Sequence, residues 1–425
     1  MPQKNEHQRS RFELASLLYH VLAFLAGLLL RLVFGLRIKK EPRIRELEGP
    51  VLVIGNHPSF LDPMIMASAL QPRRIRFLTS RSFFKNPLIG AFLYLLGAIP
   101  ITQFGSDIKA IKSILRWLKR GGTVALYPEG QRSIDGCLQP VDEAIAKLIK
   151  KADCPVVLVM EHGAYLTWPR WARAVFRIGR IQVSTCLLFT KEELHGLTTD
   201  VIYKRMMEAM AYNDYEWQRQ NKKTFYYKTL VPAKGMDRVC HQCPACKKEL
   251  AMKSASHTIT CRFCGNHGRV LQTGFIHQDK DQMQTMNNES KSYKSQKVWS
   301  DVAKWHHWQL DYLKQQMIQP FFKRSFPATL SFSCGSGKKK KIKGILTLTA
   351  QDLYFYEKDN PNDPVLLIPI ANRTGIRVSL GRYIDFVSGK FVYRFRTEPG
   401  RAVIILSDII QAKNDTACLQ SFFKY

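Results

Sequence analysis

His57 and Asp62 lie five positions apart in the stretch LVIGNHPSFLDPMI, residues 52–65, and this pair of side chains can do acid–base chemistry. A carboxylate that is hydrogen-bonded to an imidazole fixes the tautomer of the ring and stabilises the imidazolium formed when the ring accepts a proton. The spacing therefore predicts a general base. The alternative is an aspartate that caps a helix beside an incidental histidine.

A second group of polar residues lies in TVALYPEGQRS, residues 123–133. Arg132 can make a bidentate contact with a phosphate or a carboxylate because its guanidinium donors form a planar fork. Glu129 lies three positions before it. The alternative is that Glu129 and Arg132 only pair with each other in a loop.

Both groups follow apolar runs that are typical of buried strands. Val51–Ile54 precedes the first group and Val124–Tyr127 precedes the second. Asp62 with Pro63 is expected to be the N-cap and first residue of the next helix. Because ligands bind at the carboxyl ends of parallel strands in open α/β sheets, the two groups are expected to meet in one crevice.

Residues 46 to about 190 alternate between strand-like runs and helical patterns. The strand-like runs, which show no period-two alternation, are Val51–Ile54, Ile75–Leu78, Val124–Tyr127 and Val156–Met160. Asp107 is expected to cap a helix that ends at Gly121, with an apolar stripe of Ile108, Ile111, Ile114, Leu115 and Leu118. The pattern predicts an α/β domain with a mostly parallel sheet and flanking helices.

Four blocks in this order resemble the glycerolipid acyltransferases, the 1-acylglycerol-3-phosphate acyltransferase family. They are N-H-x-x-x-x-D at 56–62, LLGAIPI at 95–101, P-E-G-x-R-S at 128–133 and CPVVLVMEHG at 154–163. The resemblance covers roughly residues 15–215. The order of the four blocks makes it more specific than any single block.

The resemblance implies transfer of a fatty acyl group from acyl-CoA or acyl carrier protein to the hydroxyl of a lysolipid, in phospholipid synthesis or remodelling. His57 would remove the hydroxyl proton and Asp62 would hold the ring, so that no acyl-enzyme is needed. By analogy with the family, the acceptor would be bound by Glu129, Gly130 and Arg132, with Arg132 on an anionic headgroup.

The chain departs from the family pattern where cations often occur. Gln103 stands where an arginine is frequent, Ser80 stands where a lysine is frequent, and residues 141–144 read Val-Asp-Glu-Ala. Arg81, next to Ser80, is the expected substitute for the missing lysine in substrate binding. These differences leave open whether the acceptor is lysophosphatidate or a lysolipid with another headgroup.

Residues 14–36 form one long apolar segment, which His20 and Arg31 interrupt. The clean run from Val21 to Leu30 is shorter than the roughly 20 residues that a spanning helix needs, so an interfacial helix is as well supported as a spanning one. Basic residues flank the segment, more of them on its C-terminal side. This predicts a membrane-associated segment over 1–45, with the catalytic domain on the cytoplasmic face. A buried soluble helix and a signal peptide are the alternatives.

Two C-x2-C pairs, Cys243 with Cys246 and Cys261 with Cys264, have the spacing of a structural zinc site in a zinc ribbon, predicted over 235–272. Cys240 is a spare thiol, and the nearby histidines, less suited as replacement ligands, are His241, His257 and His267. Five of the ten cysteines fall between Cys240 and Cys264, which points to a metal site in a reducing compartment.

The remaining domains are predicted from composition. The acyltransferase domain is expected over 46–230, and a linker with an amphipathic helix over 273–322. The aromatic stripe of that helix favours a packing face, with membrane docking as the alternative. Short strands over 323–425, ending near AVIILS and a helix from about Asp408, resemble a pleckstrin-homology or GRAM-type β domain. Its first hairpin carries Lys338–Lys341 and Lys343, as a solvated loop or a contact for anionic lipid.

The formal net charge of +30 favours polyanionic partners, either anionic membrane lipids or nucleic acid. A nucleic-acid-binding protein would suit the zinc ribbon and the basic loops, but it leaves the apolar N-terminus and the His57–Asp62 pair unexplained. A catalytically silent lipid-binding adaptor is the other alternative. The sequence therefore favours a membrane-bound enzyme over both.

Overall fold

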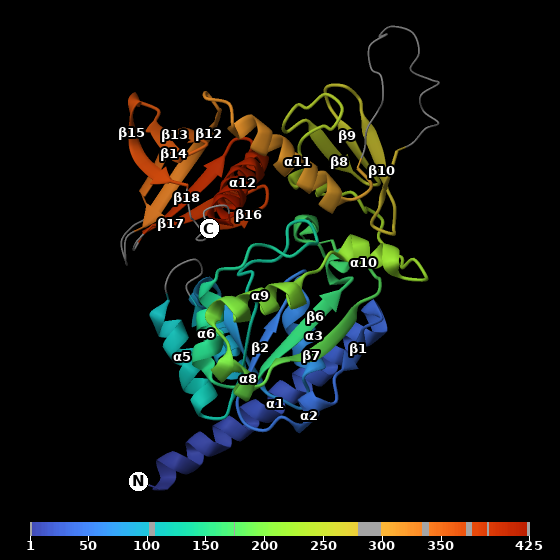
Figure 1. Ribbon diagram of the computed structural model, residues 1–425, viewed down its shortest axis with the longest axis vertical. Coiled ribbons are helices and arrows are strands. Elements are labelled where there is room, and N and C mark those ends of the chain that lie inside the picture. The colour runs from blue at the N-terminus through green and yellow to red at the C-terminus, as the bar shows by residue number, and fades with distance from the viewer. Residues whose placement is uncertain are drawn as a thin grey trace. The chain divides into compact units, whose positions relative to one another are not determined.

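A computed structural model describes residues 2–101, 107–173, 175–278, 299–333, 340–370, 376–388 and 391–422. The chain divides into two compact units, Met1–Thr229 and Leu230–Tyr425 (Figure 1). Gln103, residues 279–298 of the predicted linker and helix segment 273–322, and Lys338 with Lys339 lie outside the described residues.

The first unit is built on a seven-stranded sheet in the order β1-β7-β6-β2-β5-β3-β4. The strands are β1 (Arg37–Lys40), β2 (Val51–Gly55), β3 (Ile75–Ser80), β4 (Ile99–Ile101), β5 (Thr123–Leu126), β6 (Val156–His162) and β7 (Gln182–Phe189). Neighbouring strands are parallel except β6 and β7, so the sheet is mixed and mostly parallel, as predicted. Every residue of β2 and β5 is buried, which explains why their sequences lack alternation.

Helices cover both faces of this sheet (Figure 1). The helices of the unit are α1 (Pro2–Phe34), α2 (Arg43–Glu46), α3 (Asp62–Ala69), α4 (Pro87–Leu96), α5 (Ile108–Lys119), α6 (Ala144–Ala152), α7 (Ala164–Thr167), α8 (Lys191–Gly196), α9 (Thr199–Met210) and α10 (Asp214–Gln220). Val51 and Val53 of β2 pack with α1 and α3 in one core, whereas Leu52 and Ile54 pack with α5, α6 and α9 in another. Both faces of β2 are therefore covered by helices, in a three-layer packing.

Asp107 caps α5 as predicted, because its carboxylate accepts the N–H of Ala110 at 2.9 Å. The predicted apolar stripe of that helix is only partly buried. Ile114 and Leu118 are in the core, but Ile108 is 61% exposed and Ile111 is 39% exposed. The C-terminal part of the predicted apolar stripe is therefore in the core, whereas its N-terminal turn is exposed.

The second unit contains two antiparallel sheets. The smaller sheet consists of β8 (Met252–Ala255), β9 (Thr258–Cys261), β10 (His267–Val270) and β11 (Ile276–His277). The larger has the order β15-β14-β13-β12-β18-β17-β16. Its strands are β12 (Lys323–Ser333), β13 (Lys340–Thr349), β14 (Asp352–Glu357), β15 (Asn360–Pro369), β16 (Ile376–Ser379), β17 (Tyr383–Ser388) and β18 (Phe391–Thr397).

Two helices complete the second unit, α11 (Val302–Met317) and α12 (Val403–Phe422). The strand expected at 402–407 is wrong, because these residues lie in a 3₁₀ turn and the start of α12. Periodicity cannot separate the two structures here, since the run from Val403 to Leu406 is buried on all sides. Trp305, Leu310 and Leu313 of α11 are buried, which supports the packing interpretation of its aromatic stripe.

Candidate active site

The predicted dyad forms in the loop between β2 and α3. The Nδ1 atom of His57 lies 2.6 Å from Oδ2 of Asp62, and the Asp62 side chain is fully buried. The backbone N–H of Ser59 donates to both carboxylate oxygens at 2.9 Å. With Nδ1 bonded to the carboxylate, Nε2 is the ring atom left to accept a proton from a substrate.

Asp62 is not the N-cap that its sequence context predicts. It is the first residue of α3, preceded by Leu61 at the cap position, and α3 has no side-chain cap. Its carboxylate turns instead toward the preceding loop, where Ser59 and His57 satisfy it. The aspartate therefore holds the histidine, and the capping alternative is wrong for this residue.

Two further side chains, which sequence reasoning gave no role, fix the position of His57. The Tyr127 ring stacks on the imidazole with the centroids 4.2 Å apart and the planes 12° from parallel. The amide of Asn56 donates to the Glu161 carbonyl and accepts the Glu161 N–H, both at 2.8 Å. Asn56 therefore clamps the end of β2 to the end of β6, and its place beside His57 in the motif is the only signal for it.

Glu129 reaches the site, but through the backbone. One of its carboxylate oxygens accepts the His57 N–H at 2.6 Å and the other accepts the Gln139 N–H at 2.9 Å. Burial raises the pKa of Glu129 to about 8, while these two backbone N–H groups act to lower it. The loop is tied further by the Ser133 N–H, which donates to the His57 carbonyl at 2.8 Å. These contacts hold the backbone of His57 in place.

Of the other predicted acceptor-binding residues, Arg132 contacts the loop that carries His57, whereas Arg81 does not lie on a strand next to β2. Gly130 adopts a φ of +65°, a conformation that favours glycine, so the chain turns sharply before Arg132. The Arg132 guanidinium lies 3.3 Å from the ring centroid of Phe60, in the His57 loop. Arg81 instead contacts Asp107 at 3.5 Å, after β3, and β5 lies between β3 and β2.

The electrostatic surroundings favour a neutral His57. Burial lowers the pKa of the imidazole below its usual 6.5, and Asp62 opposes this shift. The positive charges of Arg132 and Arg170 lower the pKa further. A general base must be unprotonated before reaction, so this environment suits the predicted chemistry at neutral pH.

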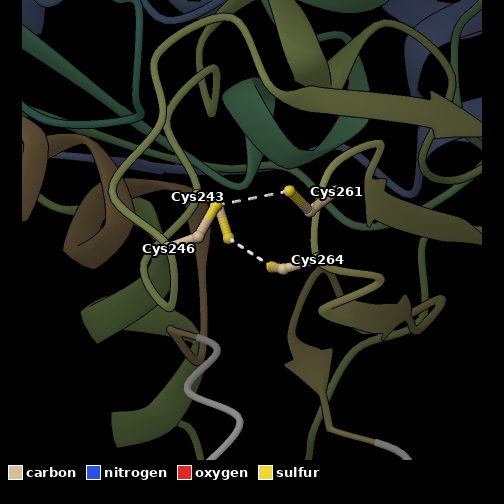
Figure 2. A group of neighbouring side chains, drawn as sticks. All are labelled: Cys243, Cys246, Cys261 and Cys264. Atoms are coloured by element: carbon tan, nitrogen blue, oxygen red, sulfur yellow. Dashed lines mark hydrogen bonds between the residues drawn. The ribbon is translucent and has the colours of Figure 1, made fainter. Parts of the chain in front are cut away.

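The four predicted zinc ligands also come together (Figure 2). Their sulfur atoms all lie within 4.8 Å of one another, with Cys243 and Cys264 at 3.6 Å and Cys246 and Cys261 at 3.7 Å. N–H donors that point at these sulfurs include the Phe263 backbone at Cys261 and the Asn266 side chain at Cys243. Four soft thiol donors in this arrangement fit a tetrahedral zinc ion.

Comparison with known proteins agrees with the four sequence blocks. Residues 36–160 match the family model described as Acyltransferase. A chloroplastic 1-acyl-sn-glycerol-3-phosphate acyltransferase of Arabidopsis thaliana is 24% identical over 180 residues, which are 42% of this chain and 49% of that protein. A chloroplastic counterpart from Brassica napus is 28% identical over 138 residues, 32% of this chain and 40% of that protein.

The human 1-acyl-sn-glycerol-3-phosphate acyltransferase beta is 27% identical over 154 residues, 35% of this chain and 55% of that protein. The chain thus spans about half of the length of the curated relatives it matches. Residues 36–160 are similar to the acyltransferase family model, and the relatives support the expectation of an O-acyltransferase.

Proposed function

We propose that this protein is a membrane-associated O-acyltransferase, which transfers a fatty acyl group from a thioester donor to the hydroxyl of a lysophospholipid. The donor is acyl-CoA or acyl carrier protein, and the product enters phospholipid synthesis or remodelling. The observation that carries the proposal is the His57–Asp62 pair, 2.6 Å apart at the carboxyl end of β2, within the matched domain.

In the proposed reaction the lipid hydroxyl donates its proton to Nε2 of His57 as its oxygen attacks the thioester carbonyl. Asp62 stabilises the imidazolium that forms. The tetrahedral intermediate then collapses, the carbon–sulfur bond breaks, and the thiolate takes the proton back from the ring. The ester and the free thiol leave, and the histidine is neutral again without an acyl-enzyme.

Membrane association is supported by the two faces of α1. Residues Glu13–Phe34 have a mean hydropathy of 2.1, enough to cross a membrane by length and composition. One stripe, which includes Tyr19, Ala23 and Leu30, is buried in the core with α3, whereas Leu17, Leu25 and Leu32 on the other side are exposed. A helix packed lengthwise on a domain suits an interfacial position. More basic residues flank the apolar segment on its C-terminal side, which supports a domain on the cytoplasmic face.

The acceptor is proposed to be lysophosphatidate or a closely related lysophospholipid, because the matched relatives are named for 1-acyl-sn-glycerol-3-phosphate. The four cysteines are proposed to hold a structural zinc ion in a ribbon, and the larger sheet with α12 is proposed to be a pleckstrin-homology-like domain. Its meander order, with β12 pairing to both β13 and β18, supports that assignment.

The direct test incubates membranes containing the full chain with labelled acyl-CoA or acyl carrier protein and a panel of lysolipids. Label in one lipid class is expected, and His57→Ala is expected to lower the rate by at least about 10²–10⁴-fold, the usual contribution of a general base. The thermal unfolding of the variant should match that of the unsubstituted protein. A folded variant with undiminished turnover would refute the role of His57, and no transfer by either protein would favour a silent lipid-binding adaptor.

A further inference from the structure

Glu161 is a buried acid of the first unit to which sequence reasoning gives no role. It is the last residue but one of β6, and its side chain is fully buried. Both oxygens of its carboxyl group lack a hydrogen-bond donor among the residues that the structure describes. An ionised carboxylate without partners is costly inside a protein, so such a group takes up a proton and becomes neutral instead.

The direction of the Glu161 side chain follows from the strand that carries it. Side chains alternate between the two faces of a strand, so Glu161 lies on the same face of β6 as Val157 and Val159. Both valines pack in the core that contains Ile65 of α3. Asp62 is the first residue of α3. The carboxyl group of Glu161 therefore points toward the N-terminal end of α3, within hydrogen-bond reach of the Asp62 carboxylate.

The two carboxyl groups differ in their hydrogen-bond partners. The backbone N–H of Ser59 donates to both oxygens of Asp62, and Nδ1 of His57 lies 2.6 Å from its Oδ2. These contacts stabilise the ionised form of Asp62, whereas the described residues offer Glu161 no such donor. Two carboxylate oxygens can bond to each other only when one of them carries a proton. The proton of this pair therefore belongs on Glu161.

The surroundings of Glu161 also favour its neutral form. Burial raises the pKa of Glu161 well above its usual range, and the negative charges of Asp62 and Asp214 raise it further. Asp214, at the start of α10, is itself buried and lies 3.8 Å from Nδ1 of His162. Tyr127 also faces the cluster, and burial raises the pKa of its hydroxyl well above the usual 10. The tyrosine stays neutral, so it adds no charge near Glu161.

The contacts of Asn56 fix the backbone of this acid. The Asn56 amide donates to the Glu161 carbonyl and accepts the Glu161 N–H, both at 2.8 Å. The strand that carries the acid is thus tied to the residue directly before His57. A row of three side chains, His57, Asp62 and Glu161, then runs from the end of β2 through the start of α3 to the end of β6.

We propose that Glu161 is a positioning residue for acyl transfer, which as a neutral carboxylic acid donates a hydrogen bond to the Asp62 carboxylate. The inference rests on the proposed function. The bond holds Asp62 in the orientation that His57 needs. It also disperses the negative charge of Asp62, so that Asp62 stays ionised while Nδ1 of His57 keeps its proton. Glu161 retains its own proton throughout the reaction.

The first test detects the proton on Glu161. Infrared spectra of the full chain at neutral pH are compared with those of Glu161→Gln and of a control, Glu193→Gln, which removes an exposed carboxylate from α8. The absorption of protonated carboxyl groups should lose one component in Glu161→Gln and none in the control. Glu129, whose pKa burial raises to about 8, contributes a component that remains.

Asp62→Asn provides a second measurement on the unsubstituted Glu161, which serves if Glu161→Gln does not fold. The Glu161 component should shift in this variant, because its hydrogen-bond partner changes from a carboxylate to an amide. A folded Glu161→Gln with an unchanged carboxyl absorption would overturn the proposal. So would a carboxyl absorption that does not respond to Asp62→Asn.

The second test is the pH profile of kcat/KM. Glu161→Gln keeps a donor and removes no charge, so the midpoint should not move. Glu161→Leu removes the donor, so Asp62 attracts the imidazolium of His57 more strongly, and the midpoint should rise by about one pH unit or more, the worth of a hydrogen bond to a charged group. Arg132 and Arg170 also act on His57, but both variants leave them in place.

A structural role alone would lower the rate without moving the midpoint, so an unchanged midpoint in Glu161→Leu would refute the hydrogen bond to Asp62. A lower midpoint in Glu161→Gln would show that a negative charge had been removed, and hence that Glu161 is ionised. A Glu161 absorption that responds to Asp62→Asn in a chain without acyl transfer would refute the proposed function alone. Acyl transfer by a chain that lacks this absorption would refute the role of Glu161 alone.

Discussion

The His57 ring meets a different group on each side. Asp62 holds Nδ1, Tyr127 covers one face, and Arg132 with Arg170 supplies nearby positive charge. Glu129 is close as well, but its carboxylate bonds the His57 backbone. The Asp62 carboxylate favours the protonated ring, while burial and the two arginines favour the neutral ring. The pKa of His57 therefore depends on the balance among these influences.

This balance predicts the pH dependence of the proposed acyl transfer. The rate constant kcat/KM should rise with pH through an apparent pKa below 6.5 and level off above it, because only neutral His57 can accept the proton. Asp62→Asn removes the charge that stabilises the imidazolium, so the apparent pKa should fall further and the plateau should drop by about 10²–10⁴-fold. The measurement is a pH–rate profile at limiting acceptor.

A wild-type midpoint above 6.5, or an upward shift in Asp62→Asn, would contradict this account of His57. The conservative control is Asp107→Asn, which removes a carboxylate that caps α5 and contacts Arg81. That variant should leave the midpoint unchanged.

At the residue scale the sequence predicts the dyad but not its supports. The spacing of His57 and Asp62 is enough because a loop of that length lets the two side chains meet. Arg170 leaves no comparable signal, since its contact with the Arg132 carbonyl spans 38 positions and depends on how the segment after β6 folds back. Long-range contacts of this kind have no local pattern in a single sequence.

The position of the site depends on how strands β2 and β6 are connected at their carboxyl ends. Asn56 lies at the end of β2 and bonds both backbone groups of Glu161 in β6. His57 follows directly, so the direction in which it leaves the sheet depends on this connection. Gly55 allows it, because a Cβ there would lie 2.9 Å from the Val159 carbonyl oxygen.

Asn56→Ala should destabilise the first unit and reduce activity together. It leaves the N–H and carbonyl of Glu161 buried without their partner, at a cost of about 1–3 kcal/mol for each group. The measurement is the free energy of unfolding in denaturant, alongside the acyl-transfer rate. The matched control is Asn86→Ala, which removes two bonds at the exposed N-cap of α4 and should cost about 1 kcal/mol with activity retained.

If Asn56→Ala unfolded no more easily than Asn86→Ala, the contact between Asn56 and Glu161 would not be energetically important.

The comparison of whole elements also shows where sequence patterns stop being informative. The buried run Val51–Ile54 is correctly predicted as a strand because it is short and follows Pro50. The run from Val403 is equally apolar, but it continues for several turns into α12, which packs on α11, β16 and β17.

The second unit behaves as one body around α11. Trp305 donates its indole N–H to the Gln242 carbonyl at 3.0 Å, next to Cys243 of the cysteine cluster. Asp408 of α12 contacts His306 of α11 at 3.1 Å and His241 of the cysteine module at 3.5 Å, and all three side chains are buried. The cysteine module, α11 and α12 are thus packed together.

Metal removal should therefore destabilise more than the ribbon. The full chain is expected to contain one zinc per molecule, and a strong chelator or Cys243→Ser with Cys264→Ser should remove it. Structural zinc contributes roughly 10–16 kcal/mol of apparent binding energy in zinc-finger peptides, so loss of the metal should expose α11 and the larger sheet to proteolysis. Elemental analysis and limited proteolysis provide the two measurements.

The control is Cys186→Ser, a half-buried cysteine of β7 outside the cluster, which should retain the metal. Cleavage confined to residues 235–272 after chelation would show that the module folds independently of α11. A zinc-free protein with unchanged proteolysis would show that the cysteines have no structural role.

The two faces of α1, an inner face buried against α3 and an exposed outer face, have a practical consequence for purification of this protein. The inner face bonds α3 directly, since the Ser68 hydroxyl donates to the Ala23 carbonyl at 3.3 Å, and Gln71 just beyond α3 donates to the His20 carbonyl at 3.3 Å. The helix that begins with Asp62 thus rests on the helix that is proposed to meet the bilayer. Trimming α1 to gain solubility would uncover α3, which carries Asp62, so a detergent that shields only the outer face is expected to preserve the His57–Asp62 pair.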